Sequence, residues 1–245
     1  MTYCVGLKID RGLVFASDTR TNAGVDNVAR FKKMKIWDAA DDRTFVLLSA
    51  GNLAVTQAVV TLLDEHMTGV EEGQQNLNNV PTMFQAARLI GAALRRVREI
   101  DGEALGAAAD AFACSFVLGG QIKGEPPRLF QIYPEGNFIE ASPDTPYFQI
   151  GEHKYGKPIL DRVAVPNMRM GDAAKLVLLS FDSTIRSNLS VGLPIDIAIY
   201  RNDTFKIGEV QRIGADDPYF RALSTAWSDA LKRAFEEIKA YPDGK

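Results

Sequence analysis

Apolar and polar residues alternate at the start of the chain in the manner of a half-buried β-strand. Val5, Leu7 and Ile9 alternate with smaller or polar residues. A tight turn, DRG, follows at residues 10–12, and the apolar run LVFASD returns at residues 13–18. The chain is therefore expected to open with an antiparallel pair of strands.

Similar patterns recur and predict the remaining elements. Further strands are predicted over residues 30–38, 44–50, 113–120, 128–134, 137–142, 147–151, 195–202 and 206–213. Apolar residues at helical spacing predict one helix after the dipeptide GN at 51–52 and others over about 82–101, 172–189 and 217–240.

Two of these helices carry specific expectations. Asp172 is a suitable N-cap for the helix that begins near it. The last helix is expected to bury its apolar side chains, namely Phe220, Leu223, Trp227, Leu231 and Phe235.

Strands and helices come in blocks rather than in strict alternation. Such an order favours antiparallel sheets with helices stacked outside them. No internal repeat, low-complexity segment or obvious linker divides the sequence. Residues 1–245 are therefore predicted to form a single α+β domain.

Composition narrows the class of protein. The chain is 46% hydrophobic and 24% charged, with a net charge of −3, which suits one globular domain and argues against nucleic acid as a partner. No apolar run approaches the roughly 18 residues of a membrane helix, and no signal peptide is expected. Cys4 and Cys114 are interpreted as buried thiols, which fits a cytoplasmic protein.

The sequence offers little support for metal or cofactor chemistry. His66, His153 and the two cysteines lack metal-ligand spacing, and no phosphate loop or dinucleotide motif is present, so no cofactor is expected. A serine hydrolase that uses either histidine is also disfavoured, because neither follows a nucleophile-elbow pattern.

Several separated segments occur in an order that resembles the proteasome β-subunit family. They are a threonine heading the first strand, the run GLVFASDTRTNAG, a KK pair before the next strand, and LLSAGN. Their combination is most similar to the bacterial Anbu, or ancestral β-subunit, branch. The resemblance implies an N-terminal nucleophile hydrolase fold, which is a four-layer αββα sandwich of two antiparallel sheets flanked by helices.

The resemblance assigns the nucleophile to Thr2. A threonine hydroxyl needs a base within hydrogen-bond reach, and a terminal threonine carries one in its own α-amine. The ordinary α-amine pKa is about 7.7–8.0, so a useful fraction is neutral near neutral pH. The arrangement requires that Met1 be removed, and the small Thr2 side chain is expected to permit this.

Other matched positions supply the rest of the catalytic group. Asp18 matches the catalytic aspartate and Lys33 the catalytic lysine, although the preceding loop is one residue shorter, which leaves Lys32 as an alternative register. Gly51 matches the residue whose backbone N–H forms the oxyanion hole. Three of these residues also have a simpler interpretation: Thr2 as an incidental second residue, Asp18 as a strand-end turn residue and Lys33 as a solvated strand charge.

Further positions are matched as supporting or substrate-contacting residues. Arg20 is expected to support the site, and Thr21, Val28 and Phe31 to line the substrate cleft. They indicate no strong preference for a charged substrate.

The sequence departs from the family pattern at two supporting positions. Glu152 stands where a serine is common, and Asn188 stands where an aspartate is common. Ser190 can replace the serine of the second position only with a shift in alignment. These changes bring the efficiency of ordinary peptide hydrolysis into question.

Two functions remain open. The first is a threonine-type hydrolase of peptide or other amide bonds, for which a separate ATP-dependent partner is possible. The second is a weakly active or non-catalytic subunit that assembles with copies of itself, since the family forms rings and the Anbu branch ring-like or open helical homo-oligomers.

Overall fold

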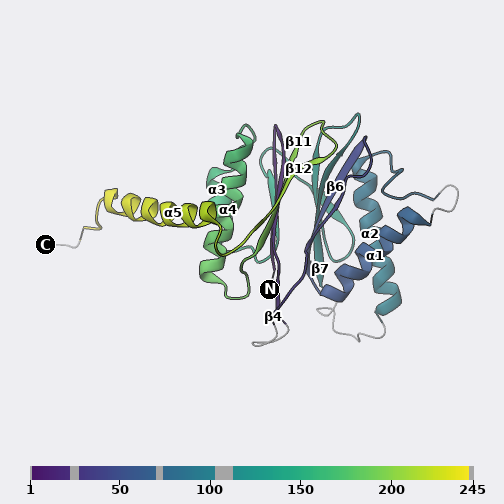
Figure 1. Ribbon diagram of the computed structural model, residues 1–245, viewed down its shortest axis with the longest axis horizontal. Helices are drawn as coiled ribbons and strands as arrows, with labels where there is room; N and C mark the ends of the chain where they lie inside the picture. The colour runs from purple at the N-terminus through teal and green to yellow at the C-terminus, as the bar shows by residue number, and fades with distance from the viewer. Residues whose placement is uncertain (1, 23–27, 70–73, 103–112, 243–245) are drawn as a thin grey trace.

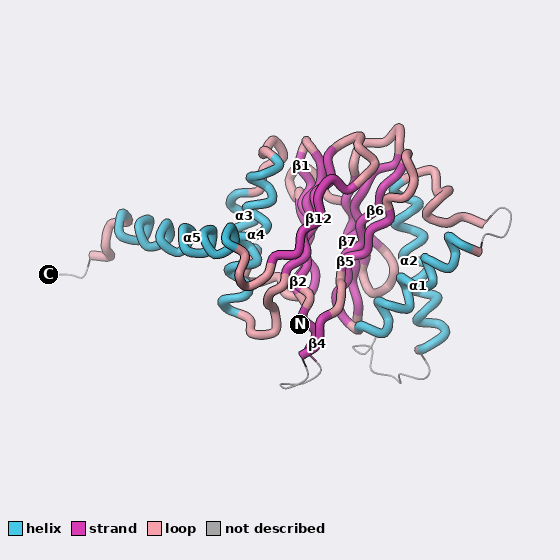
Figure 2. Tube along the Cα trace, viewed as in Figure 1, coloured by secondary structure: helices cyan, strands magenta, loops and turns pink. Residues whose placement is uncertain are grey.

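Two antiparallel sheets lie face to face, and helices cover their outer faces (Figures 1 and 2). The computed structural model describes residues 2–22, 28–69, 74–102 and 113–242. The predicted αββα sandwich of antiparallel sheets flanked by helices is confirmed. Among the described residues, no helix is both long and apolar enough to cross a membrane.

The first sheet has the strand order β10-β1-β2-β11-β12. Its strands are β1 (Tyr3–Ile9), β2 (Gly12–Asp18), β10 (Tyr147–Gly151), β11 (Ile195–Arg201) and β12 (Ile207–Ile213). The strand that follows the chain start therefore lies between β10 and β2, with Tyr3 opposite Gly151 and Cys4 opposite Ser17.

The second sheet has the order β5-β6-β7-β8-β9. Its strands are β5 (Met34–Trp37), β6 (Arg43–Gly51), β7 (Cys114–Ile122), β8 (Arg128–Ile132) and β9 (Phe138–Glu140). A short ribbon of β3 (Arg20–Asn22) and β4 (Val28–Arg30) joins the two sheets along the chain.

Apolar side chains fill the space between the sheets and beneath each helical layer. The central cluster includes Phe15, Leu48, Val117 and the thiol of Cys4. Cys4 and Cys114 are both buried and free, as predicted. The helices α1 (Leu53–Thr68) and α2 (Met83–Asp101) cover the second sheet, and α3 (Lys157–Val163) and α4 (Met170–Ser187) cover the first.

Three local predictions need correction. The segment 30–38 is not one strand: β4 ends at Arg30, β5 spans Met34–Trp37, and residues 31–33 between them belong to no strand. Asp172 is not the N-cap of α4: the helix begins one turn earlier, with Arg169 as the cap, and Asp172 pairs with Lys175 at 2.7 Å in its first turn. The sequence patterns also missed α3, whose seven residues are too few for helical spacing to register.

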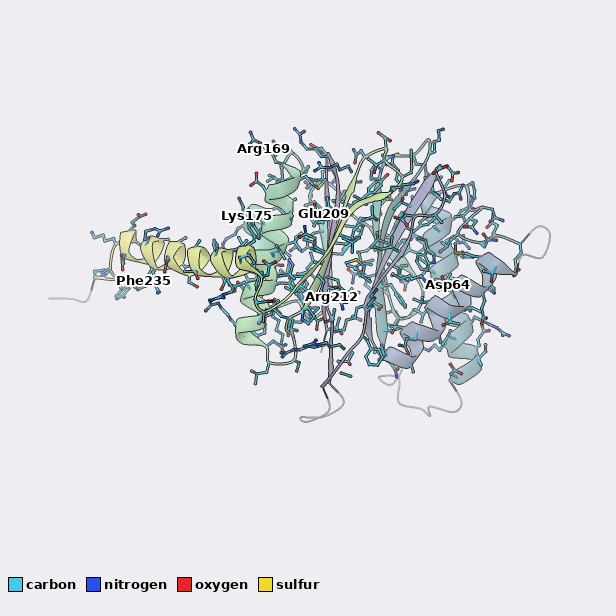
Figure 3. All side chains as sticks on the ribbon, viewed as in Figure 1. Asp64, Arg169, Lys175, Glu209, Arg212 and Phe235 are labelled. Atoms are coloured by element: carbon cyan, nitrogen blue, oxygen red, sulfur yellow. The ribbon has the colours of Figure 1, made fainter. Side chains whose placement is uncertain are left out.

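The last helix, α5 (Pro218–Glu237), is the largest departure from expectation. Phe220 and Leu223 are buried as predicted and Trp227 is partly covered, but Leu231 is 52% exposed and Phe235 79% exposed. The outer half of α5 extends away from the sheets, and Phe235 lies on that extension (Figures 1 and 3). Helical spacing marks an apolar face but does not say what covers it, so burial of these two residues was wrongly predicted.

Candidate active site

Asp18 lies at the end of β2 and is completely buried. One carboxylate oxygen accepts hydrogen bonds from the backbone N–H of Tyr3, at 2.9 Å, and from Nζ of Lys33, at 2.8 Å. The other oxygen accepts the N–H of Arg20 at 3.2 Å. The acid therefore joins the beginning of β1 to the lysine that follows β4.

Lys33 is buried, with 4% exposure, while the neighbouring Lys32 is exposed. Besides Asp18, the Lys33 ammonium donates to the carbonyl oxygen of Arg20 at 2.5 Å. Its own carbonyl oxygen accepts the N–H of Ser49, on β6, at 2.9 Å. The structure thus brings Lys33 rather than Lys32 to Asp18, and β6 fixes its backbone.

Burial raises the pKa of Asp18, while the Lys33 charge and the hydrogen bonds from Lys33, Tyr3 and Arg20 act in the opposite direction. Burial outweighs these partners, so the pKa of Asp18 lies above its ordinary value. Removal of Lys33 would leave an acid that is hard to ionise.

Thr2 lies at the edge of this group and is partly buried. Its carbonyl oxygen accepts the backbone N–H of Glu152 at 2.6 Å, and the next residue along the chain donates its N–H to Asp18. Gly151 lies against it with φ of +80°, and a Cβ there would come within 2.1 Å of the Thr2 carbonyl oxygen. Thr2 is therefore held on both sides by backbone contacts.

Gly51 ends β6 and pairs with Cys114 of β7. Its φ is +112°, and an added Cβ would lie 2.1 Å from the carbonyl oxygen of Ala113. Asn52, directly after it, caps α1 by accepting the N–H of Ala54 at 2.9 Å. Strand pairing therefore requires a glycine here, whatever part its N–H takes in chemistry.

The supporting residues Glu152 and Asn188 are both buried and contact one another. Nδ2 of Asn188 donates to the Glu152 carboxylate at 2.6 Å, and Oδ1 of Asn188 accepts the N–H of the half-buried Ser190 at 2.9 Å. Burial raises the pKa of Glu152, but hydrogen bonds from the N–H of Lys154, Asn188 and the N–H of His153 outweigh it and hold the pKa below its usual value.

The expected cleft residues lie on and beside the β3–β4 ribbon. The hydroxyl of Thr21 donates to the carbonyl oxygen of Ala29 at 3.2 Å, which ties the two short strands together. Phe31 is 38% exposed, and the backbone of Val28 pairs with Asn22. The Arg20 guanidinium packs over Gly192, where a Cβ would lie 2.7 Å from it.

A hollow of about 370 Å³ adjoins Lys33, between the start of β5, the end of β6 and α1. Three lysines line it, Lys32, Lys33 and Lys35, together with apolar and hydroxyl side chains that include Met34, Ser49, Leu53, Thr56 and Val60. The hollow is therefore next to the buried lysine and offers both apolar and hydroxyl groups to a ligand.

Two residues of the site escaped sequence reasoning. Ser49 acts through its backbone, which leaves no signature in side-chain type. Tyr3 is completely buried, and its hydroxyl donates to Ser180 on α4 at 3.0 Å and accepts from Gln149 at 2.7 Å. Tyr3 falls on the same alternation as Val5, Leu7 and Ile9, and extending that pattern by one step would have found it.

Comparison with known proteins agrees with this architecture. The proteasome subunit family model matches residues 2–200. An Anbu (Gly-1) mutant from Hyphomicrobium sp. strain MC1 is 60% identical over 99% of this chain and 100% of its own, with a TM-score of 0.93. Anbu (ancestral beta-subunit) from Yersinia bercovieri is 48% identical, over 99% of this chain and 100% of its own, with a TM-score of 0.92.

A third solved structure is a helical assembly of the Anbu complex from Pseudomonas aeruginosa. It is 44% identical over 98% of both chains, with a TM-score of 0.91. No curated protein compared with the chain matches it. From the family match over residues 2–200 and the three Anbu relatives, we conclude that this chain belongs to the proteasome subunit family.

Proposed function

We propose that this protein is a threonine-type N-terminal nucleophile hydrolase that cleaves peptide or other amide bonds. The observation that carries the proposal is the buried ion pair of Lys33 and Asp18, at 2.8 Å, with Asp18 bonded to the N–H of the residue that follows Thr2. Burial of a lysine and an aspartate has a large desolvation cost, and the ion pair adds little net stability. Ionisable residues in such environments are frequent at functional sites.

The proposed reaction begins after Met1, which lies outside the described residues, has been removed. The neutral α-amine of Thr2 takes the proton of the Thr2 hydroxyl as its oxygen forms a bond to the substrate carbonyl carbon. The resulting ammonium returns that proton to the departing amine as the C–N bond breaks, which leaves an ester on Thr2. Water, deprotonated by the same amine, then attacks the ester carbonyl carbon. The C–O bond to Thr2 breaks, and the amine returns the proton to the Thr2 oxygen, which releases the acid and restores the hydroxyl.

Lys33 supports this chemistry through its charge. A positive charge near Thr2 lowers the pKa of both the α-amine and the hydroxyl, because it disfavours the protonated amine and favours the alkoxide. Asp18 and the Arg20 carbonyl oxygen accept hydrogen bonds from Lys33 and fix the direction of its side chain. In the same scheme the Gly51 N–H stabilises the oxyanion, a contribution of about 3 kcal/mol per donor in known hydrolases.

The hollow beside Lys33 is the proposed place for the substrate side chain on the acyl side of the bond. It adjoins the lysine and extends to Leu53 and Val60 on α1. The lining combines apolar and hydroxyl groups with three lysines, so it suits a medium-sized side chain that is uncharged or acidic rather than basic.

The test uses protein purified with Thr2 as its first residue, verified by intact mass. An epoxyketone or β-lactone probe, which reacts with terminal threonines, should add one label to Thr2. Thr2→Ala should take no label, whereas Thr2→Ser, which keeps a hydroxyl, should retain some. Label on another residue, or equal labelling of Thr2→Ala, would overturn the proposal.

A second function, self-assembly, is favoured by α5. A groove of about 510 Å³ between α4 and the inner half of α5 is lined by Leu179, Leu223 and Trp227, with Lys175 at its side. The outer half of α5 carries exposed Leu231 and Phe235, followed by the acidic pair Glu236 and Glu237.

We propose that two copies pair their α5 helices antiparallel. The outer half of each helix would then fill the groove of the other, a self-complementary two-fold contact. Glu236 and Glu237 of one copy would face Lys175 and Arg221 of the other, so charge favours the same direction as the apolar contact. Self-assembly through α5 is compatible with the proposed hydrolase activity, because the two use different parts of the molecule.

A further inference from the structure

The two residues that depart from the family pattern are direct partners in the folded chain. Glu152 follows β10, and Asn188 caps the C-terminal end of α4. Their side chains are joined by a hydrogen bond of 2.6 Å, with exposures of 6% and 8%. A contact between two unusual residues that lie 36 positions apart indicates that the two departures are linked.

Their hydrogen-bonding capacities are matched. One Glu152 oxygen accepts the backbone N–H groups of His153 and Lys154, at 2.9 Å each, and the other accepts Nδ2 of Asn188. An aspartate at position 188 would put a second carboxylate against the first, and two such groups cannot both be ionised cheaply. Glutamate at 152 is thus compatible with asparagine at 188, and incompatible with the aspartate common in the family.

Glu152 also contacts Thr2 directly. The backbone N–H of Glu152 donates to the Thr2 carbonyl oxygen at 2.6 Å, and Gly151 packs against Thr2 so closely that a Cβ would lie 3.2 Å from that of Thr2. The carboxylate that bonds to Asn188 and the backbone N–H that holds Thr2 therefore belong to the same residue. Asp18, at the end of β2 on the other side of β1, bonds to the N–H of Tyr3, and Lys33 bonds to Asp18; these charges also act on Thr2 and are the same in every variant below.

We infer that Glu152 and Asn188 form a positioning pair for Thr2, in which the negative charge that the family pattern has at position 188 is moved to position 152. Asn188 holds the Glu152 carboxylate at the end of α4, and the backbone N–H of Glu152 holds the Thr2 carbonyl oxygen. The inference rests on the proposed function, because a positioned Thr2 amine matters only if Thr2 reacts. Its first consequence, however, can be measured without catalysis.

That consequence concerns the Thr2 α-amine. A nearby negative charge favours the protonated amine and raises its pKa. Glu152→Gln should therefore lower the α-amine pKa, whereas Asn188→Ala, which keeps the charge but loses the amide donor, should leave it closer to that of the wild type. The pKa is obtained from the pH dependence of Thr2 acetylation by limiting acetic anhydride, followed by peptide mass spectrometry on protein lacking Met1.

The decisive variant exchanges the two groups. Glu152→Gln combined with Asn188→Asp keeps one amide, one carboxylate and a hydrogen bond between them, but returns the charge to position 188. Each single substitution should lower the melting temperature, and the double variant should recover much of it. The α-amine pKa of the double variant should stay below that of the wild type, because the charge is no longer on the residue bonded to Thr2. A purely structural pair would restore both quantities.

Two results would overturn the inference. One is an α-amine pKa in Glu152→Gln equal to that of the wild type, and the other is a melting temperature in the double variant as low as the sum of the single losses predicts. Probe labelling separates this inference from the proposed function. If the α-amine pKa shifts as expected while Thr2 never takes an epoxyketone, the hydrolase proposal fails and the positioning pair stands.

Discussion

Lys33 illustrates how much of this site depends on single residues. Its ammonium is withdrawn from water and compensated by one carboxylate and one carbonyl oxygen. Such a pair contributes little net stability, because desolvation of both ions offsets their attraction. Loss of one partner is nevertheless destabilising, because the other is left buried without a compensating charge. The pair is therefore better explained by the charge that it delivers near Thr2 than by stability.

This explanation predicts non-additive stability losses. Asp18→Asn or Lys33→Met alone should each reduce the free energy of unfolding by about 3–5 kcal/mol, because an uncompensated buried charge remains. The double variant should lose clearly less than the sum of the two. Urea unfolding of the four proteins measures the cycle, and probe labelling of Thr2 should be lost in all three variants. Additive losses would show that the two side chains do not interact.

The lowered pKa of Glu152 predicts a specific pH dependence of the free energy of unfolding. Its folded pKa lies below its ordinary value of 4.5, so it stabilises the fold above that pH and stops doing so as pH falls through the folded pKa. Asp18, whose folded pKa is raised, contributes with the opposite sign: stability falls as pH rises from its ordinary pKa of 3.8.

A comparison of two proteins isolates the Glu152 contribution. The difference in unfolding free energy between wild type and Glu152→Gln should be largest near neutral pH and shrink in acid well below 4.5. Asp18 cancels in this difference because both proteins contain it. Urea unfolding at a series of pH values provides the measurement, and a difference independent of pH would contradict the lowered pKa.

At the scale of elements, sequence patterns located the strands of both sheets and the long helices. Each of these elements buries one face, so its apolar residues recur at a regular spacing in the sequence. Residues 31–33 interrupt the predicted strand, and Lys33 contacts Asp18 from within this interruption. Asp18, Lys33 and Gly51 were named from motif order, and the contact between Glu152 and Asn188 was not foreseen, since no local pattern links positions so far apart.

Gly151 shows how the end of β10 shapes the site. Gly151→Ala would force a methyl group into the Thr2 carbonyl oxygen at a φ of +80°, so it should lower the melting temperature and displace Thr2, with a loss of probe labelling. Gly171→Ala, in the first turn of α4, is the matched control, since an added methyl meets no atom of the described residues within 4 Å. An unaffected Gly151→Ala protein would mean that Thr2 is held by other contacts.

At the scale of the whole molecule, the compact sandwich contrasts with the extended α5 (Figure 1). A helix of its length, about 30 Å, gains most of its stability from packing of an apolar face. The inner half packs on α4, whereas Leu231 and Phe235 on the outer half are largely exposed. This exposed apolar face supports the proposed pairing of α5 helices.

The pairing of α5 helices predicts a change in mass. Leu231→Asp combined with Phe235→Asp should convert the assembled protein to smaller species, measured by size-exclusion chromatography with light scattering. Lys232→Gln, on the same helix, should leave the mass unchanged because its side chain is 75% exposed and pairs with Asp229 of its own helix. Glu236→Lys with Glu237→Lys should weaken assembly, and adding Lys175→Glu with Arg221→Glu should restore it, because the charge pairs are re-formed in the opposite sense. Wild-type mass in the Leu231 and Phe235 double variant would exclude α5 as the contact, and failure of the charge reversal would exclude the antiparallel arrangement.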